Sequence, residues 1–188
     1  CGGTGCHASE SQELLANFQA LIEKNNLGDS VQASVTGCFG FCEQGPIVKI
    51  FPDDVFYVQV KPEDASEIFE EHILDNRRVE RLLYIDPVLK ERVAEQHNIP
   101  FYQPQQRIAL RHAGLINPED IREYIAVEGY QALSKVLTQM TPQEVIEEMK
   151  RSGLRGRGGA GFSVGRKWEF GRGYDAPEKF VICNADEG

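Results

Sequence analysis

Four cysteines within the first 42 residues constrain this chain more than any other feature of its sequence. They form two pairs, Cys1 with Cys6 in a C-x4-C spacing and Cys38 with Cys42 in a C-x3-C spacing. Thiolates are soft ligands, and four of them converging on loops suit a zinc ion or an iron–sulfur cluster. Glycines within and beside both pairs let the backbone wrap tightly and aim amide groups at sulfur, which an anionic cluster requires.

The spacing leaves three kinds of site open, namely a cluster, a zinc ion and disulfides. Structural zinc usually takes C-x2-C pairs, and both pairs here are wider, so the spacing favours a cluster over zinc. Disulfides need an oxidising compartment, and no secretion leader is expected from this sequence. Phe39 and Phe41 lie inside the second pair, where aromatic side chains can keep water off a metal.

The charge of the chain is unevenly distributed. The 188 residues have a formal net charge of −9, and the isoelectric point near 5.0 argues against a dedicated nucleic-acid binder. Residues 1–75 hold thirteen acidic residues and three lysines, whereas residues 76–188 hold sixteen acidic and seventeen basic residues. Two parts with different electrostatics are therefore expected. An acidic small domain suits an electron carrier that docks on basic patches, although solubility alone is an equally good explanation.

Hydrophobic periodicity predicts a small α/β unit in the N-terminal part of the chain. The predicted elements are a helix over residues 9–26, a strand over 31–36, a hairpin over 47–60 and a helix over 62–73. Ser9 is expected to be the N-cap of the first helix, with Gln12 completing a capping box.

The remainder of the chain is predicted to be a linker followed by helices. Residues 84–106, which contain a short helix from Pro87 to His97 and several Pro and Gln residues, are expected to form an extended linker. The later elements expected are helices over 118–126, 129–140, 141–151 and 165–170 and a strand over 179–183. Thr141 is the expected N-cap of the third of these helices, with Pro142 at its first position.

The cysteine segments resemble a known family. C-x4-C with Gly-Thr-Gly-Cys-His-Ala before a helix, and Gly-Cys-Phe-Gly-Phe-Cys after a strand, are similar to the thioredoxin-like [2Fe–2S] ferredoxins over residues 1–83. The resemblance implies that Cys1, Cys6, Cys38 and Cys42 ligate a [2Fe–2S] cluster. The family fold has a central strand before its first cysteine, and this sequence starts on that cysteine, so the sheet is expected to be incomplete.

A glycine-rich loop forms a second candidate site. Gly156-Arg157-Gly158-Gly159-Ala160-Gly161 matches G-x-G-x-x-G, but a helix precedes it where a Rossmann site needs a strand. Residues 151–172 hold six basic residues and one acidic residue, so the loop suits a phosphorylated ligand, or else it is a solvated basic loop. Phe162, Trp168 and Phe170 could stack on rings or belong to a core. Asn184, Asp186 and Glu187 could bind a ribityl chain or form a strand-end turn.

These motifs together resemble a second family. Met-Thr-Pro-Gln-Glu-Val-Ile, Gly-Arg-Gly-Gly-Ala-Gly-Phe, Gly-Arg-Lys-Trp and Ile-Cys-Asn-Ala-Asp-Glu are similar to the NADH-binding flavoprotein subunit of NADH-quinone oxidoreductase over residues 107–188. The same module occurs in NAD(P)-linked hydrogenases and formate dehydrogenases. The resemblance implies FMN contacts at Gly156, Arg157, Gly158, Gly159, Lys167, Asn184, Asp186 and Glu187. It implies NAD(H) stacking on Phe162 and Phe170, and it makes Lys167 and Glu187 the candidate catalytic residues.

The resemblances imply a fragment of a flavin and iron–sulfur NAD(P)H oxidoreductase subunit, similar to the beta subunits of NAD(P)-linked [FeFe]-hydrogenases. Such a subunit takes hydride from NAD(P)H onto FMN and passes single electrons to iron–sulfur clusters, with a [4Fe–4S] site expected beyond residue 188. The fragment alone is expected to be inactive. Its expected location is cytoplasmic, and its expected partners are ferredoxin-type and hydrogenase or quinone-reductase subunits, without nucleic acid or membrane insertion.

The predicted fold class is α/β, with three parts along the chain. They are a thioredoxin-like ferredoxin domain over 1–83 that lacks its first strand, a linker over 84–106, and the helical and glycine-loop start of an FMN-binding α/β domain over 107–188. The alternative function is a stand-alone electron-transfer module or a zinc-binding interaction module without flavin chemistry.

Overall fold

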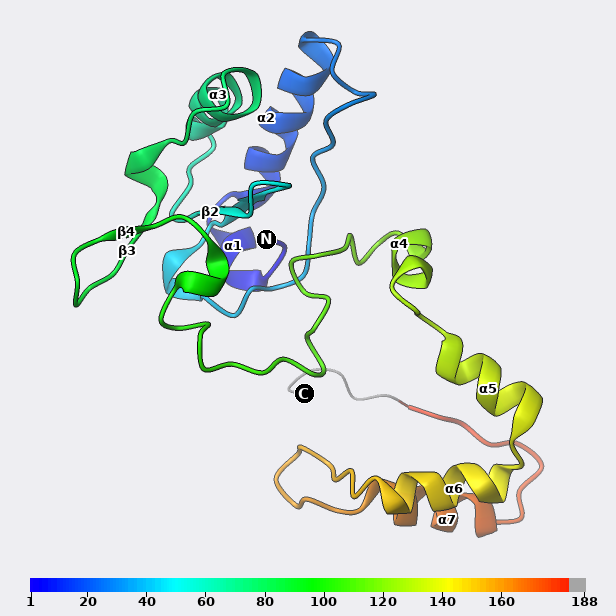
Figure 1. Ribbon diagram of the computed structural model, residues 1–188. Helices are drawn as coiled ribbons and strands as arrows, with labels where there is room; N and C mark the ends of the chain where they lie inside the picture. The colour runs from blue at the N-terminus through cyan, green and yellow to red at the C-terminus, as the bar shows by residue number, and fades with distance from the viewer. Residues whose placement is uncertain (183–188) are drawn as a thin grey trace. The chain divides into compact units, whose positions relative to one another are not determined.

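Residues 1–182 are described by the computed structural model, which divides the chain into one unit over Cys1–Val127 and a second from Glu128 onward (Figure 1). The first unit contains, in chain order, α1 (Thr4–Ala8), α2 (Ser11–Lys24), η1 (Cys42–Gln44), β1 (Val48–Ile50), β2 (Val55–Tyr57), α3 (Asp64–Glu67), η2 (Ile68–Leu74), η3 (Glu80–Leu82), β3 (Tyr84–Ile85), β4 (Arg92–Val93), η4 (Gln96–Asn98) and α4 (Ile121–Ala126). The second unit contains α5 (Gln131–Gln139), α6 (Pro142–Arg151) and α7 (Val164–Gly173). No helix within residues 1–182 is long and apolar enough to cross a membrane.

Strand β2 organises the first unit because both of its edges are hydrogen-bonded. On one side it pairs antiparallel with β1, so the predicted hairpin is confirmed. On the other side, the Phe56 amide donates to the Ala94 carbonyl at 2.8 Å, and Tyr57 forms a bridge with Leu83. A strand with both edges satisfied can be buried, and all three residues of β2 are buried.

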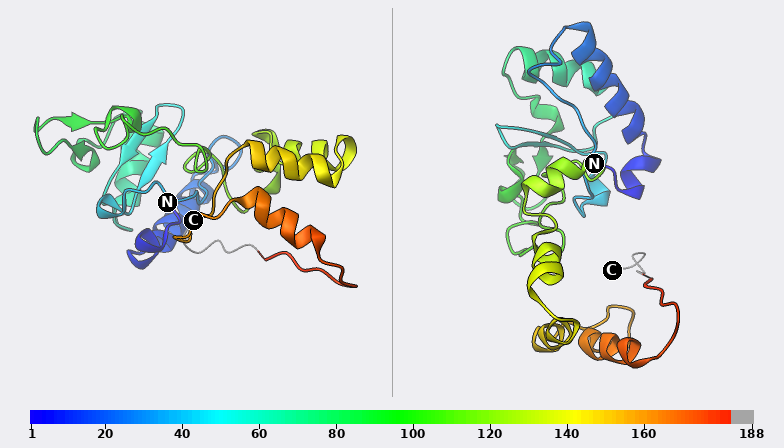
Figure 2. Two further views of the ribbon diagram at one scale, coloured as in Figure 1. Left: turned by 90° about the horizontal axis from the view of Figure 1, so that it is seen from below. Right: turned by 90° about the vertical axis from the view of Figure 1, so that its right-hand side faces the viewer.

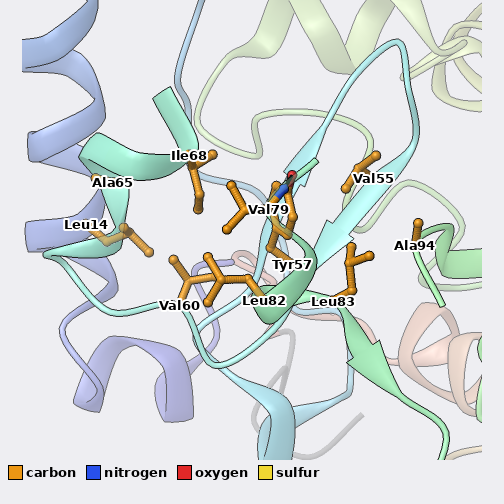
Figure 3. Close-up of a cluster of buried hydrophobic side chains, with 10 residues drawn as sticks. All are labelled: Leu14, Val55, Tyr57, Val60, Ala65, Ile68, Val79, Leu82, Leu83 and Ala94. Atoms are coloured by element: carbon orange, nitrogen blue, oxygen red, sulfur yellow. Dashed lines mark hydrogen bonds between the residues drawn. The ribbon is translucent and has the colours of Figure 1, made fainter. Parts of the chain in front are cut away.

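Helices cover this strand and complete a hydrophobic core (Figure 3). Leu14 comes from α2, Ala65 from α3 and Ile68 from η2, and these side chains meet Tyr57 and Val60. Each fully buried aliphatic side chain of this kind contributes about 1.5–3 kcal/mol to folding. The predicted α/β class is therefore confirmed for this unit.

The start of the first long helix differs from its prediction. Helix α2 begins at Ser11, and its N-cap is Glu10, whose φ of 66° is left-handed and whose side chain forms no cap. Ser9 instead ends the separate short helix α1, where its amide donates to the Cys6 carbonyl at 3.1 Å. The predicted capping box at Ser9 and Gln12 is wrong because a preceding helix uses Ser9 as its C-cap.

The predicted strand over residues 31–36 is not formed. These residues are extended, and the Thr36 carbonyl accepts from the Gly2 amide at 2.8 Å. Residues 31–36 and β1 both line a cavity of about 610 Å³, together with apolar side chains of α2. A ladder requires a neighbouring strand about 4.8 Å away, and residues 31–36 border this cavity instead of pairing with a strand of residues 1–182.

The predicted linker over residues 84–106 is also corrected. Instead of a helix from Pro87, the chain forms the hairpin of β3 and β4, and the side chains of Tyr84, Ala94, Ile99 and Tyr102 are buried. The first unit continues to Val127 rather than ending at residue 83. Backbone pairing with the free edge of β2 gives this Pro- and Gln-rich stretch a place in the core that composition does not reveal.

A buried polar chain crosses the core of the first unit. The Val79 amide donates to the Tyr57 hydroxyl at 3.0 Å, and that hydroxyl lies 2.7 Å from His72 Nδ1. His72 Nε2 lies 3.2 Å from Asp53 Oδ2. The Tyr57 hydroxyl thus links the Val79 amide to the His72 ring, and the other ring nitrogen of His72 faces the Asp53 carboxylate. Burial raises the pKa of the Tyr57 hydroxyl.

Replacing Tyr57 with Phe should destabilise the first unit by about 1–3 kcal/mol, because it leaves the Val79 amide and His72 Nδ1 buried without partners. Urea unfolding of the chain measures this change. Tyr84→Phe is the matched control, since the Tyr84 hydroxyl makes no hydrogen bond within residues 1–182. Equal stability of the two variants would show that the polar chain contributes nothing.

The second unit is built on two helices that approach closely. The predicted cap is confirmed, since Thr141 and Glu144 form a reciprocal capping box with Pro142 at the first helical position. A Cβ on Gly165 would lie 2.6 Å from the Lys150 amide nitrogen, so α7 approaches α6 at a distance that only glycine permits. Lys150 Nζ also binds Glu169 Oε1 at 2.7 Å. Both views in Figure 2 show the two helices beside each other.

The other predicted helices of the C-terminal half are present, α4 and α5 with shorter bounds than predicted and α7 with longer ones. The predicted strand over residues 179–183 is not found at residues 179–182, which are extended and exposed. Residue 183 and the five that follow lie outside the described part of the chain.

Candidate functional site

The two cysteine segments come together in the first unit through a glycine. A Cβ on Gly3 would lie 2.9 Å from Cys38 Sγ and 3.7 Å from Cys1 Sγ, so both sulfurs lie next to the same backbone atom. Residues with side chains essentially never approach at the first of these distances, and Gly3 therefore permits the contact. The segment containing the first pair and the loop containing the second are thus neighbours.

Two further glycines, Gly45 and Gly5, lie close to the remaining two cysteines. A Cβ on Gly45 would lie 2.6 Å from Cys6 Sγ, and one on Gly5 would lie 3.9 Å from Cys42 Sγ. Helix α1 turns Cys6 inward, where 3% of its surface is exposed, while Cys42 begins η1 and is exposed. Each cysteine of one pair therefore lies close to the segment of the other pair.

The surroundings of the sulfurs suit an anionic group. The Gly40 amide donates to Cys38 Sγ at 3.3 Å, and Gly40 has a φ of 74°, a left-handed conformation that glycine adopts without strain. Burial raises the pKa of the Cys6 thiol, so a thiolate there needs a compensating cation such as a metal. These observations fit thiolate ligation of an iron–sulfur cluster.

The four sulfurs do not form a finished coordination shell. Within residues 1–182, no group of three or more Cys, His, Asp or Glu side chains is assembled at metal-binding distances. The four cysteines are free thiols. Thiolates repel one another, and bringing four of them together is favourable only when a metal supplies the binding energy. Neighbouring free thiols are the arrangement expected of such ligands.

Aromatic rings surround the second cysteine loop. The buried Phe39 ring packs edge-on against Phe56 at 5.1 Å, and Phe41 stacks on Phe101 at 4.7 Å with an interplanar angle of 5°. The Tyr102 hydroxyl donates to the Phe39 carbonyl at 3.0 Å. The predicted role of Phe39 and Phe41 is a shield against water, and the structure adds Phe101 and Tyr102 to them.

Sequence reasoning missed Phe101 and Tyr102 as part of this site. They lie within the predicted linker, and the signal that could have identified them is two adjacent aromatic residues between Pro100 and Pro104. Two large rings are unusual in a solvated linker, because exposed aromatic surface is unfavourable in water.

Burial raises the pKa of Tyr102 to about 12, above the value near 10 of an exposed tyrosine. The unfolded chain therefore loses this proton at lower pH than the folded chain does. The contribution of the Tyr102 proton to the free energy of unfolding is therefore fully present below pH 10. It is lost as the pH rises through 12, which lowers the free energy of unfolding by about 2 kcal/mol. Tyr102→Phe should lack this loss, which urea unfolding at pH 9 and at higher pH would reveal. Parallel pH profiles for the two proteins would contradict the account.

The glycine-rich loop of the second unit is closed by its own backbone. The Gly156 amide donates to the Phe162 carbonyl at 2.8 Å, and the backbones of Arg155 and Ser163 form an antiparallel β-bridge. Arg155 Nε also donates to the Gly161 carbonyl at 2.6 Å. Ser163 caps α7 by accepting from the Arg166 amide at 3.4 Å. The loop therefore leads directly into the N-terminus of α7.

The structure brings some of the predicted flavin-site residues together. Gly158 and Gly159 face open space, which suits close approach of a ligand to the backbone. The Phe162 and Phe170 rings lie 6.3 Å apart, with half of each side chain exposed. Lys167 projects from α7 and is exposed, and Arg157 is exposed in the loop. The donors and charges present fit a phosphorylated, ring-bearing ligand. Asn184, Asp186 and Glu187 lie outside the described residues.

Comparisons with known proteins identify both parts of the chain. Ferredoxin, 2Fe-2S, of Clostridium pasteurianum is 39% identical over 77 residues, which cover 41% of this chain and 76% of the ferredoxin. A solved structure of the thioredoxin-like [2Fe–2S] ferredoxin from Aquifex aeolicus is 38% identical, covers 43% of this chain and 82% of that one, and has a TM-score of 0.40. The chain belongs to the [2Fe–2S] ferredoxin family.

The C-terminal part of the chain is similar to a second family. Residues 149–188 match the family described as the Nuo51 FMN-binding domain. NADP-reducing hydrogenase subunit HndC of Solidesulfovibrio fructosivorans is 60% identical over 84 residues, 45% of this chain and 17% of the relative. An NADH-quinone oxidoreductase subunit of Rhizobium meliloti is 44% identical over 81 residues, 43% of this chain and 19% of the relative. The predicted resemblances are confirmed, and the chain spans less than a fifth of these two relatives.

Proposed function

We propose that the chain is a fragment of an oxidoreductase subunit that oxidises NAD(P)H with FMN and passes single electrons to iron–sulfur clusters. The observation that carries this proposal is the presence, in one chain, of a [2Fe–2S] ferredoxin match and an FMN-binding match over residues 149–188. The relatives are named as an NADP-reducing hydrogenase subunit, an NADH-quinone oxidoreductase subunit and a 2Fe-2S ferredoxin. The residues from Gly156 to Lys167 fit FMN in charge and backbone exposure.

The first unit would hold the cluster through Cys1, Cys6, Cys38 and Cys42. A cluster held there supplies one-electron transfer. The protein supplies the amide of Gly40 to a ligand sulfur and the rings of Phe41 and Phe101 near the loop. These groups fix the position of the loop and limit the approach of water, two properties by which a protein adjusts the potential of a metal site.

The second unit would hold FMN at Gly156, Arg157, Gly158 and Gly159, with Lys167 supplying positive charge. When bound, FMN accepts a hydride from the nicotinamide and releases electrons one at a time. Lys167 would stabilise negative charge on the ligand, and Phe162 and Phe170 would stack against the nicotinamide nucleotide. We assign the rest of the FMN contacts to Asn184, Asp186 and Glu187, with a catalytic role for Glu187, and we place a [4Fe–4S] site beyond residue 188.

We further propose that the subunit works in the cytoplasm within a multi-subunit redox complex. The free cysteines suit a reducing compartment, where NAD(P)H is also available. The relatives named as hydrogenase and quinone oxidoreductase subunits support ferredoxin-type, hydrogenase or quinone-reductase partners. The alternative remains an electron-transfer or zinc-binding module without flavin chemistry.

Lys167→Gln tests the flavin role in the full-length subunit. Loss of a charge-assisted contact costs about 1.5–3 kcal/mol, so the FMN dissociation constant should rise about tenfold or more. Titration of the flavin-free protein with FMN, followed by flavin fluorescence, measures this constant.

Lys135→Gln, which removes an exposed lysine from α5, is the control and should leave the FMN dissociation constant unchanged. If wild-type protein binds no FMN, the alternative without flavin chemistry is correct. If both variants bind FMN as the wild type does, Lys167 has no role in binding it.

A further inference from the structure

Residues 102–116, which we call the strap, pack on the second cysteine loop. The Phe39 carbonyl, directly after Cys38, accepts from the Tyr102 hydroxyl at 3.0 Å and from Arg107 Nη2 at 3.3 Å. A single backbone oxygen beside one proposed ligand is therefore bound by two side chains of the strap. The sequence alone predicts a free linker for the first residues of this segment.

The far end of the strap is also fixed to the cysteine loop. The Thr36 hydroxyl donates to the Ile116 carbonyl at 2.9 Å and accepts from the Gly114 amide at 3.0 Å. Gly114 has a φ of 88°, and a Cβ there would lie 2.2 Å from Phe39 Cε1. Only glycine satisfies both the left-handed backbone and this close approach. The strap thus contacts both the residue before the loop and the ring inside it.

Arg107 is held in place from three directions. Besides the Phe39 carbonyl, it donates from Nη1 to the Ala113 carbonyl at 3.4 Å, and its guanidinium lies 4.9 Å from the centre of the Tyr102 ring. A guanidinium cannot lose its charge in a protein, so this position carries a permanent positive charge. The charge lies beside a segment that, over residues 1–75, has no arginine and only three lysines.

We propose that Arg107 is a positioning and electrostatic residue for the cluster, setting its reduction potential by placing a fixed positive charge beside the Cys38 loop. This inference rests on the proposed cluster at the four cysteines. Reduction adds one electron and one unit of negative charge to a cluster that thiolates already make anionic. A nearby cation stabilises the reduced form more than the oxidised form, and in a partly buried site this effect exceeds that in water. Arg107 therefore raises the potential.

The surroundings of Tyr102 support this placement. Burial is the main cause of the raised pKa of its hydroxyl, Arg107 acts to lower that pKa, and the Cys38 thiolate acts to raise it. The Tyr102 hydroxyl and the Arg107 guanidinium both bind the Phe39 carbonyl, which directly follows Cys38 in the chain.

Arg107→Gln tests the proposal in the full chain purified without oxygen. Electron paramagnetic resonance during a reductive titration measures the midpoint potential of the [2Fe–2S] signal. The midpoint should become more negative by about 30–60 mV, a three- to tenfold change in the one-electron equilibrium. Arg107→Lys keeps the charge without the planar guanidinium and should therefore shift the midpoint by less than half as much as Arg107→Gln does.

Arg111→Gln is the matched control, because it removes the same charge at a position four residues further along the chain. The Arg111 side chain is exposed, and among the contacts described it binds only its neighbour His112. Solvent screening should keep its effect below about 10 mV. An unchanged midpoint in Arg107→Gln, or an equal shift in Arg111→Gln, would overturn the proposal.

If Arg107→Gln loses its cluster, the midpoint potential of Arg107→Lys tests the proposal instead. A large shift of that midpoint with the charge retained would refute the electrostatic role, and a midpoint close to that of the wild type would support it. Gly114→Ala provides a second variant, because its Cβ would push the strap from Phe39 and should lower the midpoint in the same direction. A wild-type chain without any [2Fe–2S] signal would instead refute the proposed cluster itself.

Discussion

Close contact between glycine backbone and cysteine sulfur is the constraint on which the rest of the structure depends. Gly3 meets Cys38, and Gly45 meets Cys6, at distances that any side chain would prevent. These contacts hold together two segments more than thirty residues apart in the sequence. Both cysteine segments are also joined to the hairpin of β1 and β2. The Cys1 amino group donates to the carbonyl of Ile47, just before β1, and the turn at Gly45 connects Cys42 to the same strand. A redox site built this way needs a rigid support but few side chains of its own.

Elements with local signals were predictable from the sequence. Helix α6 has local start signals at Thr141 and Pro142 and a local stop signal at Gly153, and its N-cap at Thr141 is found where it was predicted. The hairpin of β1 and β2 also has a local signal, two runs of β-branched and aromatic residues joined by the turn at Pro52, Asp53 and Asp54. The candidate ligands Cys1, Cys6, Cys38 and Cys42 were identified by type and spacing, and their proximity follows from the fold.

Elements that depend on distant partners were not predictable. Residues 31–36 have strand composition but form no ladder with another strand of residues 1–182, whereas residues 84–102 have linker composition and pair with the edge of β2. The role of Arg107 is of the same kind, because its partners Phe39 and Tyr102 are brought to it only by the fold. Pairing and packing over long sequence separations override local propensity in each of these cases.

The content of iron and acid-labile sulfide tests the central claim most directly. The 188-residue chain, purified without oxygen and reconstituted with iron and sulfide, should contain about two iron and two sulfide per chain and lose both when Cys38 and Cys42 are replaced by serine. Bound zinc without iron or sulfide, or a cluster that survives the loss of both cysteines, would contradict the account.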